Sequence, residues 1–280
     1  MINSRARDLK KRLRAGEVTL GTWLGIANTS VAEIVAGVGF DWALIDTEHG
    51  VFGNESLQSV LMAFSGSKTV PIVRVPSNDP VPIKQVLDMG ADGIMIPMVN
   101  SVEGARAAVA ACKYPPVGTR GAGPLRAADY GRKTNEYFAQ ANDSVIVMPQ
   151  IEHIDAARDI ERILEVPGID IVCLGPTDMS GTAGVLRQFD HPIMVKAIEA
   201  VLKAAKTRKL PACLGIDLSD SETRRMIKLG ATMVLAGDDV GSLCTGLANS
   251  LEHMRAVTGT GSSRKTSSKT KSRPKAPSSR

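Results

Sequence analysis

Aromatic residues are scarce in this chain of 280 residues, at 4% of its composition. A site that stacks nucleobases between aromatic side chains is therefore not expected. No apolar run reaches the ~18 residues that a membrane span requires, and no signal-peptide pattern opens the sequence. The Arg-rich, acid-poor start is also found in transit peptides, but it leads directly into a strand-like segment. We expect a soluble, cytoplasmic protein with an aliphatic core, because 43% of its residues are hydrophobic.

Cysteine is equally sparse and forms no motif. Cys112, Cys173, Cys213 and Cys244 lie far apart, without a C-x-x-C pair or the spacing of zinc ligands. We interpret them as small, reduced core residues. A catalytic thiol is not expected.

Acidic and large apolar residues are both missing from the C-terminal segment 258–280, which carries seven Lys or Arg. Of the 34 basic residues in the chain, 27 precede this segment, against 29 acidic ones, so the net charge of +5 belongs to the tail. A segment without large apolar side chains cannot bury enough surface to offset its ordering entropy. We therefore predict a folded domain at 1–257 and a disordered basic tail at 258–280. Weak, salt-dependent contact between the tail and nucleic acid is the alternative to a simple terminal extension.

Eight short apolar runs alternate with helix-like segments in the folded part. They cover residues 20–25, 42–46, 70–75, 93–97, 145–151, 169–174, 211–214 and 232–236. Continuously apolar strands separated by helices are typical of a parallel sheet covered on both faces, and eight such units close a barrel. We predict an α/β fold of the (β/α)8 TIM-barrel class. The competing doubly wound sheet would normally have a glycine-rich nucleotide turn after its first strand, and residues 23–27 do not form one.

Capping signals support this alternation. Ser30 with Glu33 and Ser219 with Glu222 match capping boxes. Further N-caps are expected at Asn54, Ser101 and Asp239, and helix ends in a left-handed residue at Gly39, Gly90 and Gly230. Residues 6–15 are predicted to form an amphipathic helix. The segment 114–142 is too rich in Pro and Gly at its start to be regular, and long ordered loops in barrels are more often functional than idle.

Polar side chains follow the second and third apolar runs. Asp46 ends one run, His49 comes three residues later, and Arg74 lies near the end of the next. Reactive groups gather at the carboxyl ends of barrel strands, so we expect these side chains to lie together. Asp46 would then orient the imidazole of His49 and raise its basicity. The alternative is that Asp46 caps the loop and His49 is a surface residue.

The fifth and sixth runs deliver Gln150, Glu152 and Asp178. Glu152 and Asp178 are suitable ligands for a hard divalent ion such as Mg²⁺ or Mn²⁺. Arg74 beside them suits a carboxylate or a developing enolate, and His49 supplies a base. Together they favour proton abstraction or carbon–carbon cleavage beside a carbonyl. Two structural alternatives stay open, namely pairing of Arg74 with Asp79 and Glu152 as a helix-start acid.

Seven segments, in order, resemble the motifs of the HpcH/HpaI aldolase family. They are GTWLG at 21–25, DTEH at 46–49, VRVP at 73–76, PMV at 97–99, GTRG at 118–121, QIE at 150–152 and GPTD at 175–178. The likeness runs from residue 8 to 257. The family consists of class II, metal-dependent pyruvate aldolases on a modified (β/α)8 barrel, which cleave 4-hydroxy-2-oxo acids to pyruvate and an aldehyde. The resemblance implies that activity here.

The resemblance also implies residue roles. Glu152 and Asp178 would hold the metal, Mg²⁺ or Mn²⁺ with Co²⁺ as a further candidate, and this ion would chelate pyruvate. Arg74 would stabilise the enolate, and His49 would act with a bound water as the acid/base. Asp46, or Asp88 of a neighbouring subunit, would orient His49. The site would then be shared in a homo-oligomer, a hexamer built from dimers that exchange their last helix. Substrate contacts are implied for Trp23, Arg120, Gln150, Gly175, Pro176, Thr177 and Leu214.

Two segments depart from the pattern of many relatives. They are MSGTAGV at 179–185 and the looser LGID at 214–217. The first shapes the aldehyde side of the site, so the resemblance does not name the aldehyde. Oxaloacetate decarboxylation or a reaction like that of macrophomate synthase would use the same enolate and stays open. A thioester lyase related to citrate or malyl lyases is a further alternative, although no extended CoA-binding segment is evident.

Overall fold

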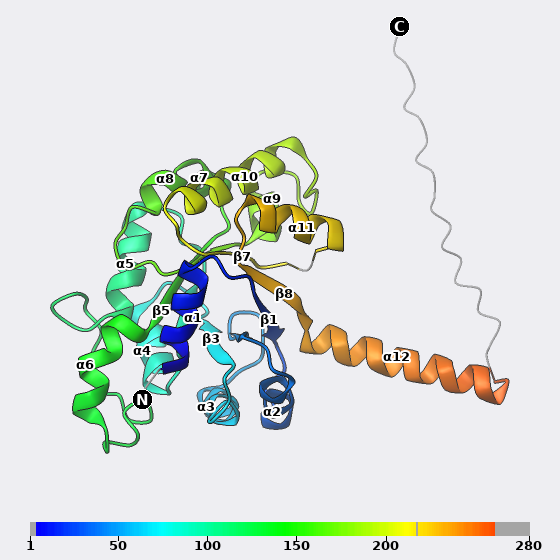
Figure 1. Cartoon of the computed structure of the whole chain (residues 1–280), viewed down its shortest axis with the longest axis horizontal. Helices are drawn as coiled ribbons and strands as arrows, with labels where there is room; N and C mark the ends of the chain where they lie inside the picture. The colour runs from blue at the N-terminus through cyan, green and yellow to red at the C-terminus, as the bar shows by residue number, and fades with distance from the viewer. Residues whose placement is uncertain (1–3, 217, 261–280) are drawn as a thin grey trace, which may run out of the picture. The chain divides into compact units, whose positions relative to one another are not determined.

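The computed structural model describes residues 4–216 and 218–260 of the chain. It divides into two units, Met1–Gly241 and Ser242–Arg280. In the first unit, eight parallel strands pair in sequence order and close into a barrel, which helices surround (Figure 1). The predicted (β/α)8 class is therefore confirmed. The strands are β1 (Thr19–Leu24), β2 (Trp42–Asp46), β3 (Val70–Arg74), β4 (Gly93–Ile96), β5 (Ile146–Ile151), β6 (Val172–Leu174), β7 (Ala212–Leu214) and β8 (Met233–Asp238).

All eight predicted strands are present; β2 matches its predicted bounds, and the other seven have shifted ends. The largest shift is at β6, which begins three residues late, because Asp170 before it uses its carboxylate to accept the N–H of Val147 (3.1 Å). The helices of the first unit are α1 (Ser4–Arg14), α2 (Thr29–Val38), α3 (Asn54–Ala63), α4 (Pro80–Asp88), α5 (Val102–Cys112), α6 (Thr134–Ser144), α7 (Ile154–Arg158), α8 (Ile160–Ile163), α9 (Pro176–Thr182), α10 (Pro192–Thr207) and α11 (Asp220–Leu229). A last helix, α12 (Asp239–Thr258), continues into the second unit.

Alternate strand residues enter two separate cores. Trp42 and Leu44 of β2 pack inside the barrel, whereas Ala43 and Ile45 pack outward against the helices. This is the period of two expected for a strand that is buried on both faces. The predicted N-terminal helix is confirmed as α1, whose Leu9 joins the inner core. Its side chains close one end of the barrel interior and leave the carboxyl ends of the strands to polar residues.

Ion pairs fasten α1 to the barrel. Lys10 lies 2.7 Å from Asp170, and Arg14 bonds to the same carboxylate at 3.0 Å. Arg5 pairs with Asp92, which is buried. Each of these contacts joins α1 to a residue just before a strand.

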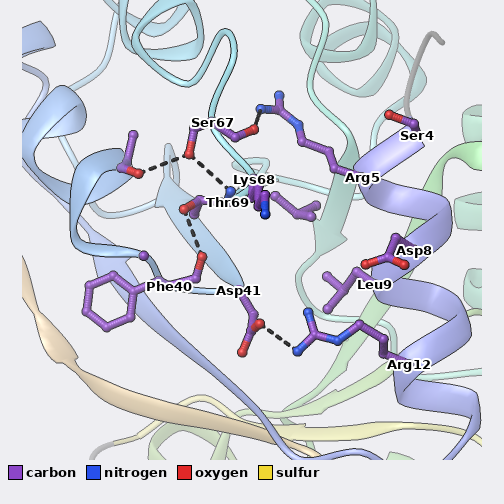
Figure 2. A pocket seen from close by; sticks show the side chains of 13 residues that line it. Ser4, Arg5, Asp8, Leu9, Arg12, Phe40, Asp41, Ser67, Lys68 and Thr69 are labelled. Carbon is purple, nitrogen blue, oxygen red and sulfur yellow. Dashed lines mark hydrogen bonds and ion pairs between the residues drawn. The ribbon is translucent and has the colours of Figure 1, made fainter.

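A pocket of about 830 Å³ adjoins α1 (Figure 2). Arg12 and Asp41 pair beside it at 2.7 Å, and the hydroxyls of Ser67 and Thr69 donate to backbone carbonyls. Among the described residues that line it, none is a predicted site residue. Its lining residues 39–41 and 67–70 lie at the starts of β2 and β3, at the opposite ends of these strands from Asp46 and Arg74, so the pocket is not where the chemistry is expected.

The helix caps correct some predictions. Asn28, not Ser30, caps α2 by accepting the N–H groups of Ser30 and Val31. Gly53, not Asn54, precedes α3. The box of Ser219 with Glu222 and the cap Ser101 are confirmed, as are the left-handed residues Gly39 (φ 99°), Gly90 (φ 94°) and Gly230 (φ 120°). Asn28 and Ser30 are both good capping residues, and only the backbone decides which one precedes the first turn.

The C-terminal part of the chain belongs to the second unit. The first unit ends at Gly241, and the predicted folded domain at 1–257 stays a prediction. Asp239, expected to precede the last helix, is its first residue, and its carboxylate accepts the N–H groups of Gly25 and Ile26, both at 2.9 Å. Taken by itself, α12 repeats Leu243, Leu247, Leu251 and Met254 at helical spacing, so it has one apolar face. Of the predicted tail, residues 261–280 lie outside the described part of the chain.

The burial of the cysteines and the length of the apolar helices were both expected from the composition. Cys112, Cys173 and Cys213 are buried as expected, whereas Cys244 is exposed and is not a core residue. No helix in the described part of the chain is long and apolar enough to cross a membrane.

Candidate active site

Asp46 and Arg74 form the centre of the site at the carboxyl ends of β2 and β3. They are register partners in the sheet. Arg74 donates through Nε and Nη2 to the two oxygens of Asp46, at 2.9 and 2.6 Å. Both residues are buried. Arg74 thus has a carboxylate partner, but it is Asp46 and not Asp79, which instead caps α4.

The loop after β2 is fixed by the same carboxylate. Asp46 Oδ1 accepts the backbone N–H groups of Glu48 (3.1 Å) and His49 (3.2 Å). Burial raises the pKa of Asp46, but the bonds from Arg74 and these two N–H groups outweigh it and hold the pKa below its usual value. Asp46 therefore orients the loop and Arg74 in this chain.

His49 does not receive the contact predicted for it. Its side chain is 70% exposed, and the nearest carboxylate oxygen among the described residues is Glu48 Oε2, 4.0 Å from Nε2. Asp46 does not contact the imidazole in this structure, and its oxygens bind Arg74 and the loop amides instead. The predicted contact between Asp46 and the imidazole is therefore corrected, and no carboxylate of the described residues orients His49.

Glu48 is a site residue that the sequence reasoning missed. Its Oε2 lies 3.0 Å from Arg74 Nη1. Burial raises the pKa of Glu48, and the positive charge of Arg74 only partly opposes this. The side chain of Thr47 bonds back to the carbonyl of Arg74 (2.6 Å), so Asp46 and Glu48 both reach Arg74. The pattern Asp-x-Glu at the end of a buried strand could have indicated Glu48.

Glu152 follows β5 and is only 2% exposed. Its Oε1 accepts the N–H of Met98 at 2.5 Å, and Met98 has a left-handed backbone (φ 52°) that few non-glycine residues adopt. Burial, followed by the charges of Glu48 and Asp178, raises the pKa of Glu152 to about 7, although the Met98 N–H and Arg74 oppose the shift. Since α7 begins only at Ile154 and is capped by His153, Glu152 is not a helix-start acid.

The segment after β6 brings the second predicted ligand. Gly175 precedes α9, Pro176 opens it, and Asp178 lies exposed in its first turn. A Cβ on Gly175 would lie 2.7 Å from Gln150 Nε2 and 2.8 Å from Glu152 Oε2, so only glycine fits. The β5 and β6 ends are thus packed against each other at this point.

The remaining predicted residues fall into two groups. Trp23 joins the site, because the Arg74 guanidinium lies 4.8 Å from its ring centroid, and Leu214 ends β7. Asp88 ends α4 and bonds instead to Arg120, whose Nη2 lies 2.6 Å from Asp88 Oδ1. The Arg120 side chain is 1% exposed. The described contacts of Arg120 are thus with Asp88, Tyr114 and Tyr137, and its predicted contact with a substrate stays a prediction.

Comparison with known proteins places this site in a family. The model of the HpcH/HpaI aldolase/citrate lyase family matches residues 19–245. The chain belongs to this family. A 4-hydroxy-2-oxo-heptane-1,7-dioate aldolase from Salmonella dublin is 41% identical over 239 residues, which cover 85% of this chain and 90% of that protein.

Solved structures of the HpcH/HpaI family agree with the fold. A family protein from Burkholderia cenocepacia has a TM-score of 0.83 at 31% identity, covering 89% of this chain and 99% of that one. Macrophomate synthase has a TM-score of 0.80 at 28% identity, with 92% and 90% covered.

A divalent metal in this HpcH/HpaI chain would have only a few acidic side chains as ligands. Among the described residues, no group of three or more His, Cys, Asp or Glu side chains could hold an ion. Mg²⁺ and Mn²⁺ typically take only one or two protein carboxylates and keep several waters. Gln150 Oε1 is buried without a hydrogen-bond partner among the described residues, as expected where a hydrated ion or an oxygen-rich ligand belongs. The residues present therefore fit such an ion.

Replacing Gly175 by Ala should disturb the site without touching a reactive group. The added methyl would displace Gln150 or Glu152, and misplacement on this scale costs roughly 10²-fold in kcat/KM. Gly53→Ala is the matched control, because nothing lies within 4 Å of its Cβ position. Wild-type kcat/KM in Gly175→Ala would contradict the close packing of β5 and β6.

The stability of the protein should depend on pH through Asp46. Its pKa is lowered in the folded state, so its stabilising contribution is complete above the unfolded value of about 4 and is lost as pH falls through the folded pKa. Asp46→Asn should flatten this acid-side loss in urea unfolding at a series of pH values. Asp190→Asn, at an exposed position, should keep the wild-type pH dependence. An equal acid-side loss in Asp46→Asn and wild type would show that Asp46 does not cause it.

Proposed function

We propose that this chain is a divalent-metal-dependent aldolase that cleaves a 4-hydroxy-2-oxo acid into pyruvate and an aldehyde. The observation that carries the proposal is the buried Arg74. Its guanidinium lies 2.6 Å from Asp46 Oδ2 and 3.0 Å from Glu48 Oε2, and its positive charge opposes the rise in the pKa of Glu152. The 41% identity to a 4-hydroxy-2-oxo-heptane-1,7-dioate aldolase supports it.

Glu152 and Asp178 would hold the metal, which is Mg²⁺, Mn²⁺ or Co²⁺. When bound, it supplies Lewis-acid stabilisation of the pyruvate enolate. Glu152 is suited to this role because its carboxylate is buried next to the negative charges of Glu48 and Asp178, which a cation would offset. Gln150 and the backbone near Thr177, with Gly175 and Pro176, would hold the carboxylate of pyruvate.

Arg74 would donate to the 2-oxo oxygen as negative charge grows there while the C3–C4 bond breaks. His49 would remove the proton of the 4-hydroxyl through a water as the aldehyde forms, and would return a proton to C3 of the pyruvate enolate. Its exposed imidazole is accessible for both steps. Trp23 and Leu214 would border the substrate, since Trp23 lies against Arg74.

We further propose that the working enzyme is a homo-oligomer. Among the residues that the structure describes, no carboxylate orients His49, whereas Asp88 is 20% exposed and has one oxygen bound by Arg120. Asp88 of a neighbouring subunit would orient His49. The apolar face of α12, defined by Leu243, Leu247, Leu251 and Met254, would pack on a second copy.

The decisive experiment measures pyruvate release from a panel of 4-hydroxy-2-oxo acids, with Mg²⁺, Mn²⁺, Co²⁺ or a chelator. Metal-dependent pyruvate from at least one hydroxy-oxo acid supports the aldolase and identifies its aldehyde. Both dicarboxylic and monocarboxylic acids belong in the panel, because the segment 179–185 departs from many relatives. Absence of pyruvate from every panel member would overturn the proposal.

Decarboxylation is the second candidate function. The likeness to macrophomate synthase, at 28% identity and a TM-score of 0.80, favours testing it. Loss of CO₂ from oxaloacetate leaves the same pyruvate enolate that aldol cleavage produces, so Arg74 could serve both reactions. Pyruvate from oxaloacetate but from no hydroxy-oxo acid would establish decarboxylation as the main activity.

A further inference from the structure

Arg120 is a buried cation whose position is set by distant parts of the chain. It lies in the irregular segment between α5 and α6, and its side chain is 1% exposed. The guanidinium carbon is 4.4 Å from the ring centroid of Tyr114 and 5.8 Å from that of Tyr137. Its Nη2 donates to Asp88 Oδ1 at 2.6 Å and to the Tyr137 hydroxyl at 3.1 Å. Asp88 is therefore the carboxylate that balances this buried charge.

The loop that carries Arg120 packs closely against the end of α5. The backbone N–H of Thr119 donates to Ala110 (2.8 Å), and that of Arg120 donates to Lys113 (2.9 Å). A Cβ on Gly118 would lie 2.4 Å from the carbonyl oxygen of Lys113. Only glycine permits this contact, which presses the loop onto the end of α5 and directs Arg120 inward.

Asp88 occupies an unfavourable place for an anion. It is the last residue of α4, where the helix dipole is negative. Arg120 binds one of its carboxylate oxygens, and Oδ2 has no hydrogen bond to any residue that the structure describes. Asp88 is thus held at one oxygen and open at the other, as expected of a carboxylate that serves a group outside its own chain.

We propose that Arg120 is a positioning residue for catalysis in trans: it fixes Asp88 so that the free oxygen of Asp88 meets His49 of a neighbouring subunit. This inference rests on the proposed aldolase function and its shared site. The rigid, planar fork of Arg120, which lies against the ring of Tyr114 and donates to the Tyr137 hydroxyl, sets the direction of the carboxylate. Burying a cation costs free energy unless a carboxylate balances its charge, and Asp88 is the carboxylate that balances Arg120.

The first test separates kcat from KM. Arg120→Met should lower kcat roughly 10- to 100-fold, the effect of losing a group that orients a reacting residue, with KM changed less than twofold. Asp88→Asn should lower kcat by at least as much. Because the two side chains act as a unit, the double variant should be no slower than Asp88→Asn alone. Multiplying effects in the double variant would overturn the proposal.

The control separates positioning from folding. Arg126→Met removes another loop arginine, which donates to the carbonyls of Met89 and Leu61 and does not contact the Asp88 side chain. It should lower the melting temperature while leaving kcat of the folded enzyme within twofold of wild type. If Arg120→Met behaves in the same way, Arg120 is structural only and the proposal is wrong. If Arg120→Met does not fold, Arg120→Lys, which keeps the charge without the fork, takes its place.

The deciding experiment is complementation between subunits. His49→Ala subunits, unfolded and refolded together with Arg120→Met subunits, should regain about a quarter of wild-type activity, because half of the pairs are mixed and each restores one of two sites. His49→Ala with Arg74→Lys should regain none, since both groups belong to the same chain's site. If His49→Ala subunits regain activity when mixed with Asp88→Asn subunits but not when mixed with Arg120→Met subunits, the positioning role of Arg120 is wrong. The proposed aldolase function is not affected by that result. Absence of pyruvate from the wild type overturns the proposed function and the inference with it.

Discussion

Glu152→Gln and Asp178→Asn should each abolish tight Mn²⁺ binding and lower kcat/KM on the order of 10³-fold or more. A bound ion contributes several kcal/mol of charge stabilisation in such reactions, and each 1.4 kcal/mol is about tenfold in rate. Glu152 is the stronger case because it is buried, and the charges of Glu48 and Asp178 help to raise its pKa to about 7. Both substitutions keep side-chain shape and remove only charge.

Metal binding is measured without turnover, by calorimetry or by the electron paramagnetic resonance signal of free Mn²⁺. Asp155→Asn is the matched control, because its carboxylate lies three residues from Glu152 but is 64% exposed and pairs with Arg158. It should bind Mn²⁺ as the wild type does. Wild-type Mn²⁺ affinity in both Glu152→Gln and Asp178→Asn would refute the assignment of the ligands.

The barrel could be predicted because its signal is local. The strands β2 to β7 are wholly buried, so their residues form nearly continuous apolar runs, as β2 and β3 show. Strand ends and caps were less certain, since Asn28 and Ser30 satisfy the same local rule. The end of the first unit at Gly241 could not be read from the pattern, because the apolar face of α12 does not reveal which surface covers it.

The site was predicted as a set of strand ends and only partly as a set of contacts. Arg74 was placed correctly at its strand end, but its partners Asp46 and Glu48 depend on the turn of the loop at 46–49. That turn also leaves His49 without the predicted carboxylate. Arg120 was expected at the substrate from the resemblance to the family, yet its surroundings come from Asp88 and Tyr137, 32 and 17 residues away. Side-chain direction in irregular segments is set by such distant contacts, which sequence spacing does not encode.

Arg74→Lys should reduce kcat roughly 10²- to 10³-fold, the usual cost of losing one donor to a developing oxyanion. Arg74 donates to both oxygens of Asp46, lies 3.0 Å from Glu48 and packs against Trp23. A lysine ammonium is a point charge on a flexible stem and cannot reproduce this planar fork. The free energy of unfolding should fall as well, because the buried Asp46 would keep one hydrogen bond from a cationic side chain in place of two.

The metal distinguishes this effect from the loss of Glu152 or Asp178. Arg74→Lys keeps the positive charge beside Glu152, so Mn²⁺ affinity should stay within a few-fold of wild type while kcat falls. Arg158→Lys, at a residue whose side chain is 66% exposed, is the control for a generic arginine replacement and should leave kcat unchanged. If Arg74→Lys turned over as fast as the wild type, charge alone would suffice at this position, and the bidentate contact with Asp46 would serve folding rather than the stabilisation of the enolate oxygen.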